Sequence, residues 1–106
     1  MRAKHEIYIT DWWMSPDVYL KRPVPVDENG NPTCKKYRLD TILNNRAKMG
    51  VKIYILLYRE FEHALPNRSM FTQQVLMGLD NTIEVLRHPG NMIFVWSHHE
   101  KIVVID

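Results

Sequence analysis

Two residues near the C-terminal end of the chain, His99 and Lys101, have the types and the spacing needed to act together on a phosphate ester. They precede an apolar run, Ile102–Ile105, which is followed by Asp106. Side chains alternate between the two faces of a strand, so His99 and Lys101 project from the same face. Seven steps of about 3.3 Å place Asp106 roughly 23 Å from His99, with the opposite parity. One small ligand therefore reaches His99 and Lys101 but not Asp106, which we interpret as a buried structural carboxylate.

The chemistry open to the pair follows from its two functional groups. An imidazole near neutral pH acts as a nucleophile or as a general acid or base. The ammonium group of Lys101 provides a fixed positive charge for phosphate oxygens. Displacement at a phosphodiester needs an aligned nucleophile and stabilised charge on the equatorial oxygens, and the pair suits this reaction. A carboxylate is expected to orient the other ring nitrogen of His99; Glu100 has the wrong parity, so that partner is expected beyond Asp106.

The spacing His-x-Lys-x4-Asp at His99, Lys101 and Asp106 resembles the HKD signature of the phospholipase D superfamily. The flanking residues resemble the first HKD copy of the eukaryotic, phosphatidylcholine-type phospholipases D. The similarity runs from about His5 to Asp106 and weakens only between Val24 and Lys36. The segments that carry it are Ile9–Pro16, Tyr19–Pro23, Arg38–Leu43 and His98–Asp106.

This resemblance implies a function. In the family one HKD histidine attacks phosphorus to form a phosphohistidine, and the other protonates the leaving alcohol. Water or a short primary alcohol then releases phosphatidic acid or a phosphatidyl-alcohol. The resemblance makes His99 the nucleophile, Lys101 the phosphate-binding residue and Asp106 the third residue of the catalytic motif, with no cofactor and no metal.

The resemblance also implies an organisation and a set of partners. Residues 1–106 would form part of a phospholipase D catalytic lobe, ending at the first HKD motif. The expected partners are phosphatidylcholine at a membrane surface and the second HKD half, which the chain lacks; no nucleic acid is expected. We therefore expect a cytoplasmic enzyme, peripheral on the cytosolic face of membranes, and we expect the isolated piece to be inactive.

The bulk composition is that of an ordinary globular domain, with 45% hydrophobic and 25% charged residues. A net charge of +2 mildly favours anionic partners. The single cysteine, Cys34, cannot form an internal disulfide, which suits a reducing cytosol. No apolar run approaches the ~18 residues of a membrane-spanning helix.

The hydrophobic pattern predicts strands at residues 6–10, 51–58 and 82–87 and helices at 38–49 and from Ser69 onward. Ser69 is a candidate helix cap. The order strand, helix, strand, helix, strand predicts an α/β fold: a mixed, mostly parallel sheet with helices on its faces. Ile93–Trp96 is expected to lead into a buried motif strand. If that strand runs antiparallel to the first, Trp12 and Trp13 meet His99 at one edge of the sheet.

Several roles remain open at this point. Trp12 and Trp13 are either core residues or, in our substrate-binding prediction, indoles at a lipid-facing mouth. The cluster Lys35, Lys36 and Arg38 is either a solvated helix entry or a contact for phospholipid headgroups.

Other functions compete with the phospholipase. A zinc site at the histidines is disfavoured because adjacent residues of a strand face opposite sides and Lys101 repels a cation. The alternatives kept are an inactive half-site module that binds anionic phospholipid or a partner protein, and another HKD phosphodiesterase, namely a nuclease or a phospholipid synthase.

Overall fold

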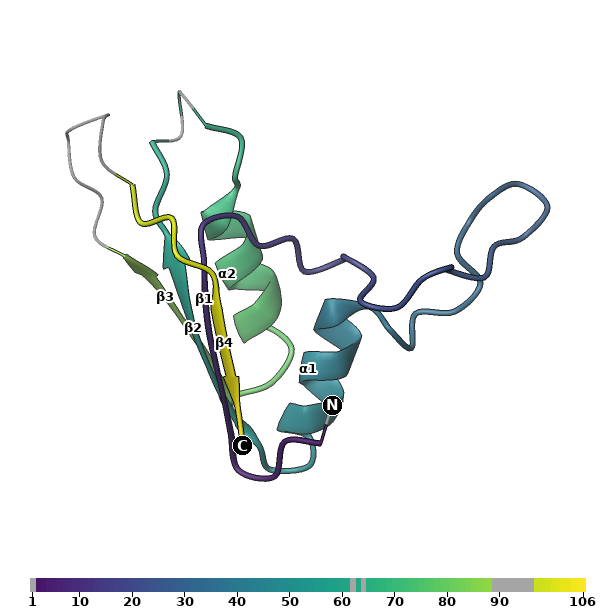
Figure 1. Cartoon of the computed structure of the whole chain (residues 1–106), viewed down its shortest axis with the longest axis horizontal. Coiled ribbons are helices and arrows are strands. Elements are labelled where there is room, and N and C mark those ends of the chain that lie inside the picture. The colour runs from purple at the N-terminus through teal and green to yellow at the C-terminus, as the bar shows by residue number, and fades with distance from the viewer. Residues whose placement is uncertain (1, 62, 64, 89–96) are drawn as a thin grey trace.

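The chain alternates strands and helices before it ends in two strands, as seen in a computed structural model that describes residues 2–61, 63, 65–88 and 97–106 (Figure 1). Their bounds are β1 Glu6–Asp11, α1 Leu39–Ala47, β2 Lys52–Tyr58, α2 Ser69–Met77, β3 Ile83–His88 and β4 Ile102–Ile105. The predicted strands and helices are confirmed to within a few residues at their ends. The prediction for Ile93–Trp96 falls outside the described residues.

The sheet is mixed and mostly parallel, as predicted. Its strand order is β3-β2-β1-β4, in which β1, β2 and β3 run parallel and β4 runs antiparallel to β1. Each parallel connection passes through a helix, and both helices lie on the same side of the sheet (Figure 1). Two successive crossovers of the same hand between neighbouring strands place both helices on one face.

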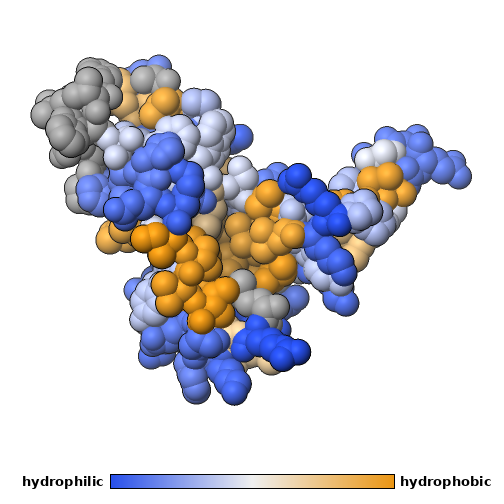
Figure 2. Space-filling view, viewed as in Figure 1, coloured by the Kyte–Doolittle hydropathy of each residue, from blue (hydrophilic) through white to orange (hydrophobic). Residues whose placement is uncertain are grey.

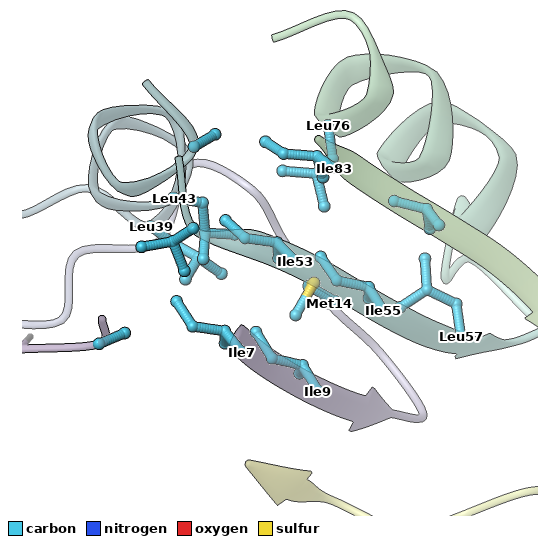
Figure 3. Packing of buried hydrophobic residues seen from close by; sticks show 14 residues of the cluster. Ile7, Ile9, Met14, Leu39, Leu43, Ile53, Ile55, Leu57, Leu76 and Ile83 are labelled. Atoms are coloured by element: carbon cyan, nitrogen blue, oxygen red, sulfur yellow. The ribbon is translucent and has the colours of Figure 1, made fainter. Parts of the chain in front are cut away.

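The hydrophobic core lies between that face and the two helices. Alternate residues of the parallel strands point into it, among them Ile7, Ile53 and Ile83, which are aligned by the strand register. Leu43 of α1 and Leu76 of α2 cover them and are fully buried (Figure 3). Burying a side chain of this size stabilises the fold by about 1.5–3 kcal/mol.

None of the described residues covers the opposite face of the sheet or the strand β4. All four residues of β4 are between 43% and 58% exposed, and they form an apolar surface in front of the sheet (Figure 2). The expectation of a buried motif strand is therefore wrong within the described residues. The physical reason is position: β4 is an edge strand, whereas α1 and α2 pack over β2 and β3.

The start of α2 differs from the sequence prediction. Ser69 is its first residue and not a cap: the carboxylate of Glu60, nine residues earlier, accepts the Ser69 N–H at 2.8 Å. The Ser69 hydroxyl instead accepts a hydrogen bond from Arg87 Nε of β3 at 2.8 Å. Glu60 thus neutralises the positive end of the helix dipole from a preceding loop.

Candidate active site

The pairing of β1 with β4 brings two distant segments together at one end of the sheet. Thr10 pairs with Ile102, so the residues that follow β1 lie beside those that precede β4. Because β1 and β2 are parallel, the carboxyl end of β2 lies at the same end of the sheet. The conditional prediction that Trp12 meets His99 there is confirmed: their ring centroids lie 4.9 Å apart.

His99 and Lys101 contact each other directly. The Lys101 ammonium donates to His99 Nδ1 at 3.1 Å and to the His99 carbonyl oxygen at 2.9 Å. Both residues are exposed to solvent. An ammonium group has only donors, so Nδ1 must accept, and a neutral imidazole in this arrangement carries its proton on Nε2. The structure therefore brings the predicted pair together on an open surface.

The ring of Trp12 packs against both His99 and Lys101. Besides the contact with His99, the ring lies 5.7 Å from the Lys101 ammonium. Tyr58, the last residue of β2, stacks against Trp12 with centroids 6.5 Å apart and an interplanar angle of 16°. The Trp12 backbone is held as well, since the side-chain amide of Asn67 donates to its carbonyl oxygen at 2.9 Å. Asn67 is buried and Trp12 is half-buried, so this contact is partly shielded from water.

Trp13 has a different environment. It packs edge-on against Trp12, with centroids 6.0 Å apart, and is 47% exposed. The two tryptophans predicted to bind substrate are therefore not equivalent: Trp12 lies against the reactive pair, and Trp13 faces solvent.

Asp106 lies at the other end of β4 and binds backbone. Its carboxylate accepts the N–H groups of Lys4, His5 and Glu6 at 3.0–3.2 Å. These N–H groups, foremost that of His5, hold the pKa of the Asp106 carboxyl below its ordinary value of 3.8. The group makes the backbone contacts expected of a structural carboxylate, but it is exposed and not buried.

The remaining histidines stand apart from the reactive pair. His98 stacks on His88 with centroids 5.6 Å apart, and its Nε2 lies 3.5 Å from Glu100. His63 is exposed and contacts Phe61. Within residues 2–61, 63, 65–88 and 97–106, no three His, Cys, Asp or Glu side chains are grouped so that they could hold a metal ion.

Two residues of the site were missed from the sequence, Tyr58 and Asn67. Tyr58 had a signal, because the carboxyl ends of parallel strands converge on one edge. Asn67 had none: it lies in the loop before α2 and reaches Trp12 across 55 residues of sequence. Two grooves, of about 350 Å³ beside α2 and about 700 Å³ on the uncovered sheet face, are not lined by His99 or Lys101.

The fold and the site together define an α/β unit that presents a His-x-Lys pair at the end of a mixed sheet. The chain matches no family model. It is 48% identical over 98% of its length to "Phospholipase D1" of Homo sapiens, 43% over all of it to "Phospholipase D2" of Bos taurus, and 44% over 98% to "Phospholipase D zeta 2" of Arabidopsis thaliana.

The chain belongs to the phospholipase D family. It spans about 9–10% of the length of these relatives. None of the helices in the described part of the chain combines the length and apolar character of a membrane-spanning segment.

Proposed function

We propose that this chain supplies half of the active site of a phospholipase D that hydrolyses phosphatidylcholine to phosphatidic acid and choline. The observation that carries the proposal is the direct contact of Lys101 Nζ with His99 Nδ1 at 3.1 Å, on a surface open to a headgroup. A nucleophile and a cation so close together can both engage a single phosphodiester.

The reaction begins with a change of partner at the imidazole. With Lys101 on Nδ1, the neutral ring has its proton on Nε2 and no free nucleophilic lone pair there. If a carboxylate instead accepts a hydrogen bond from Nδ1–H, Nε2 is unprotonated. The ammonium of Lys101 is then displaced from the imidazole and can bind the phosphate oxygens. Among the described residues the nearby Glu100 contacts His98, so this carboxylate is expected from another part of the protein.

The chemistry then takes two displacements. Nε2 of His99 attacks phosphorus, and the phosphorus–oxygen bond to choline breaks while a histidine of a second HKD half protonates the choline oxygen. Water, deprotonated by that second histidine, attacks the phosphohistidine and releases phosphatidic acid. A short primary alcohol in place of water yields a phosphatidyl-alcohol by the same step.

We further propose that the enzyme acts at the cytosolic surface of a membrane, where it meets its phosphatidylcholine substrate. In support, Lys21 and Lys36 lie close to the same ring, that of Tyr37, with their ammonium groups 4.9 and 5.5 Å from its centroid. Neither ammonium forms an ion pair within the described part of the chain, so both remain open to anionic headgroups.

Replacing the nucleophile tests the proposal. In the full-length enzyme, His99→Ala should lower both hydrolysis and alcohol transfer by about 10⁴-fold or more, measured as choline release and phosphatidyl-butanol formation. His63→Ala, which removes an exposed loop imidazole, is the matched control and should retain activity.

Retained turnover in His99→Ala would overturn the assignment of the nucleophile. Turnover by the 106-residue chain alone would overturn the half-site. Cleavage of a nucleic-acid phosphodiester, with phosphatidylcholine left intact, would favour a nuclease.

A further inference from the structure

We infer that Trp12 is a positioning residue for the proposed reaction: its indole fixes the orientation of the His99 imidazole, keeps the ammonium of Lys101 close to it and does not itself bind the lipid. The inference rests on the proposed function, because it gives the pair under Trp12 a reaction to perform. It goes beyond that function by assigning a role to a side chain that carries no reactive group.

The indole of Trp12 lies against both reactive side chains. Trp12 touches both members of the pair, His99 at 4.9 Å between centroids and Lys101 at 5.7 Å from the ring. His99 and Lys101 are exposed and precede β4, so the strand ladder does not fix them. An aromatic face beneath both groups restricts their rotamers and attracts the ammonium through its quadrupole.

Trp12 is itself held in place by neighbouring elements. Tyr58 stacks on its ring from the end of β2, and Asn67 holds its carbonyl oxygen at 2.9 Å. The chain just after Trp12 is held as well: the buried Thr72 of α2 donates a hydrogen bond to the carbonyl oxygen of Met14 at 2.8 Å. Trp12 is therefore anchored to β2 and to the segment around α2. An indole fixed in this way can restrict the motion of His99 and Lys101, which are otherwise exposed.

Trp12 and Trp13 differ in how much of their surface is available to a substrate. The Trp12 ring already contacts Tyr58, Trp13, His99 and Lys101, and its indole nitrogen is buried. Trp13 is the indole with about half of its surface free. The geometry therefore gives the lipid-facing role to Trp13 and the positioning role to Trp12.

The first test is spectroscopic and needs no turnover. In the NMR spectrum of the 106-residue chain, the carbon-bound ring protons of His99 should show ring-current shifts from Trp12. Trp12→Ala should abolish these shifts, and Trp13→Ala should leave them nearly unchanged. Shifts that survive Trp12→Ala would contradict the contact, and this outcome does not depend on whether His99 is a nucleophile.

The second test is kinetic and uses the full-length enzyme. Trp12→Ala should lower kcat on the order of 100-fold, with KM changed less than about twofold, because the pair is misplaced but the lipid still binds. Trp12→Phe keeps an aromatic face and should recover most of kcat. Trp13→Ala should instead raise KM.

The outcomes distinguish the positioning role of Trp12 from the proposed phospholipase D function. A rise in KM at unchanged kcat in Trp12→Ala would show that Trp12 binds substrate and would overturn the inference. If Trp12→Ala fails to fold, Trp12→Phe decides: loss of kcat in a normally folded Trp12→Phe would contradict positioning by an aromatic face. Full activity of His99→Ala would reject the proposed function while leaving the NMR result standing.

Discussion

At the scale of single residues, the site depends on which atoms compete for one hydrogen-bond position. Nδ1 of His99 accepts from Lys101 in this structure, yet the proposed reaction needs the same nitrogen to donate to a carboxylate. Lys101 therefore has two positions, one on the imidazole and one on the phosphate. The tautomer of His99 and the location of that ammonium change together.

Asp106 provides a prediction at this scale. Its carboxylate accepts three backbone N–H groups, which lower its pKa in the folded chain relative to the unfolded chain. A lowered folded-state pKa stabilises the fold at pH values above the unfolded pKa, and the stabilisation disappears as the pH falls through the folded pKa. Asp106→Asn should lower the thermal midpoint at pH 7, and the difference from the original chain should shrink as the pH falls below 3.8 and through the lowered folded-state pKa of Asp106.

Thermal unfolding of both chains across that pH range, followed by circular dichroism, is the measurement. Glu28→Gln, in an exposed loop, serves as the matched acid-to-amide control. A difference between Asp106→Asn and the original chain that stayed constant with pH would mean that the amide contacts do not depend on the charge of Asp106.

At the scale of elements, the pattern of apolar residues predicted the strands and helices because it is a local property. β1 and β2 carry alternating or continuous β-branched and apolar residues, and the helix that ends at Ala47 is followed by Gly50 in a left-handed conformation with φ +84°. The start of α2 was predicted less well. Its N-terminal N–H is satisfied by Glu60, and no local pattern specifies a partner nine residues away.

The apolar face of α2 shows the same limit. Phe71, an apolar residue in the first turn of α2, is 46% exposed, with Arg68 packed over its ring at 4.6 Å. Buried Thr72 lies on the inner face instead, where its hydroxyl meets the Met14 carbonyl. A polar residue with a tertiary partner replaced an apolar one, which hydrophobicity alone does not predict.

The meeting of Trp12 with His99 was predicted only on the condition that β4 runs antiparallel.

The loop between β1 and α1 carries a prediction of its own. It projects away from the sheet (Figure 1), and the Leu20 N–H donates to the Tyr37 carbonyl oxygen, so that Lys21 and Lys36 lie near one another at its base. Each cation near an anionic surface contributes about 1 kcal/mol. The double substitution Lys21→Ala/Lys36→Ala should weaken binding to phosphatidylserine-containing vesicles by about tenfold or more at low salt.

Cosedimentation of the 106-residue chain with vesicles measures this effect. Lys48→Ala/Lys52→Ala is the control, because it also removes two exposed lysines but lies outside this loop, between α1 and the start of β2. An equal loss of binding in Lys48→Ala/Lys52→Ala would show that net charge, and not this loop, attracts the chain to the membrane. Equal binding to vesicles of phosphatidylcholine alone would contradict an electrostatic contact.

At the scale of the whole molecule, the described residues cover the sheet on one face only, and its β4 edge is apolar. Val104 pairs with Tyr8 on the uncovered face, and the two are 55% and 44% exposed. An exposed apolar edge strand pairs readily with other strands. The chain alone should therefore self-associate with rising concentration, and Val104→Lys should reduce the association.

Light scattering against concentration, with circular dichroism to verify the fold, measures this property. Asn45→Lys adds the same charge on an exposed position of α1 and should leave association nearly unchanged. If Val104→Lys and Asn45→Lys reduce self-association equally, net charge and not the β4 edge controls it. A monomeric original chain at high concentration would contradict the prediction outright.

The tie between the two ends of the chain bears on when the site exists during synthesis. His5 and Asp106 are hydrogen-bonded across 101 residues, and β4 can join β1 only after the intervening strands have been made. A ribosome adds about 5–20 residues per second, so a nascent chain spends about 5–20 seconds with β1 in place and β4 still absent. The imidazole and the ammonium of this half of the site are thus synthesised after β1, β2 and β3, so the strands that align them are made before the reactive groups are.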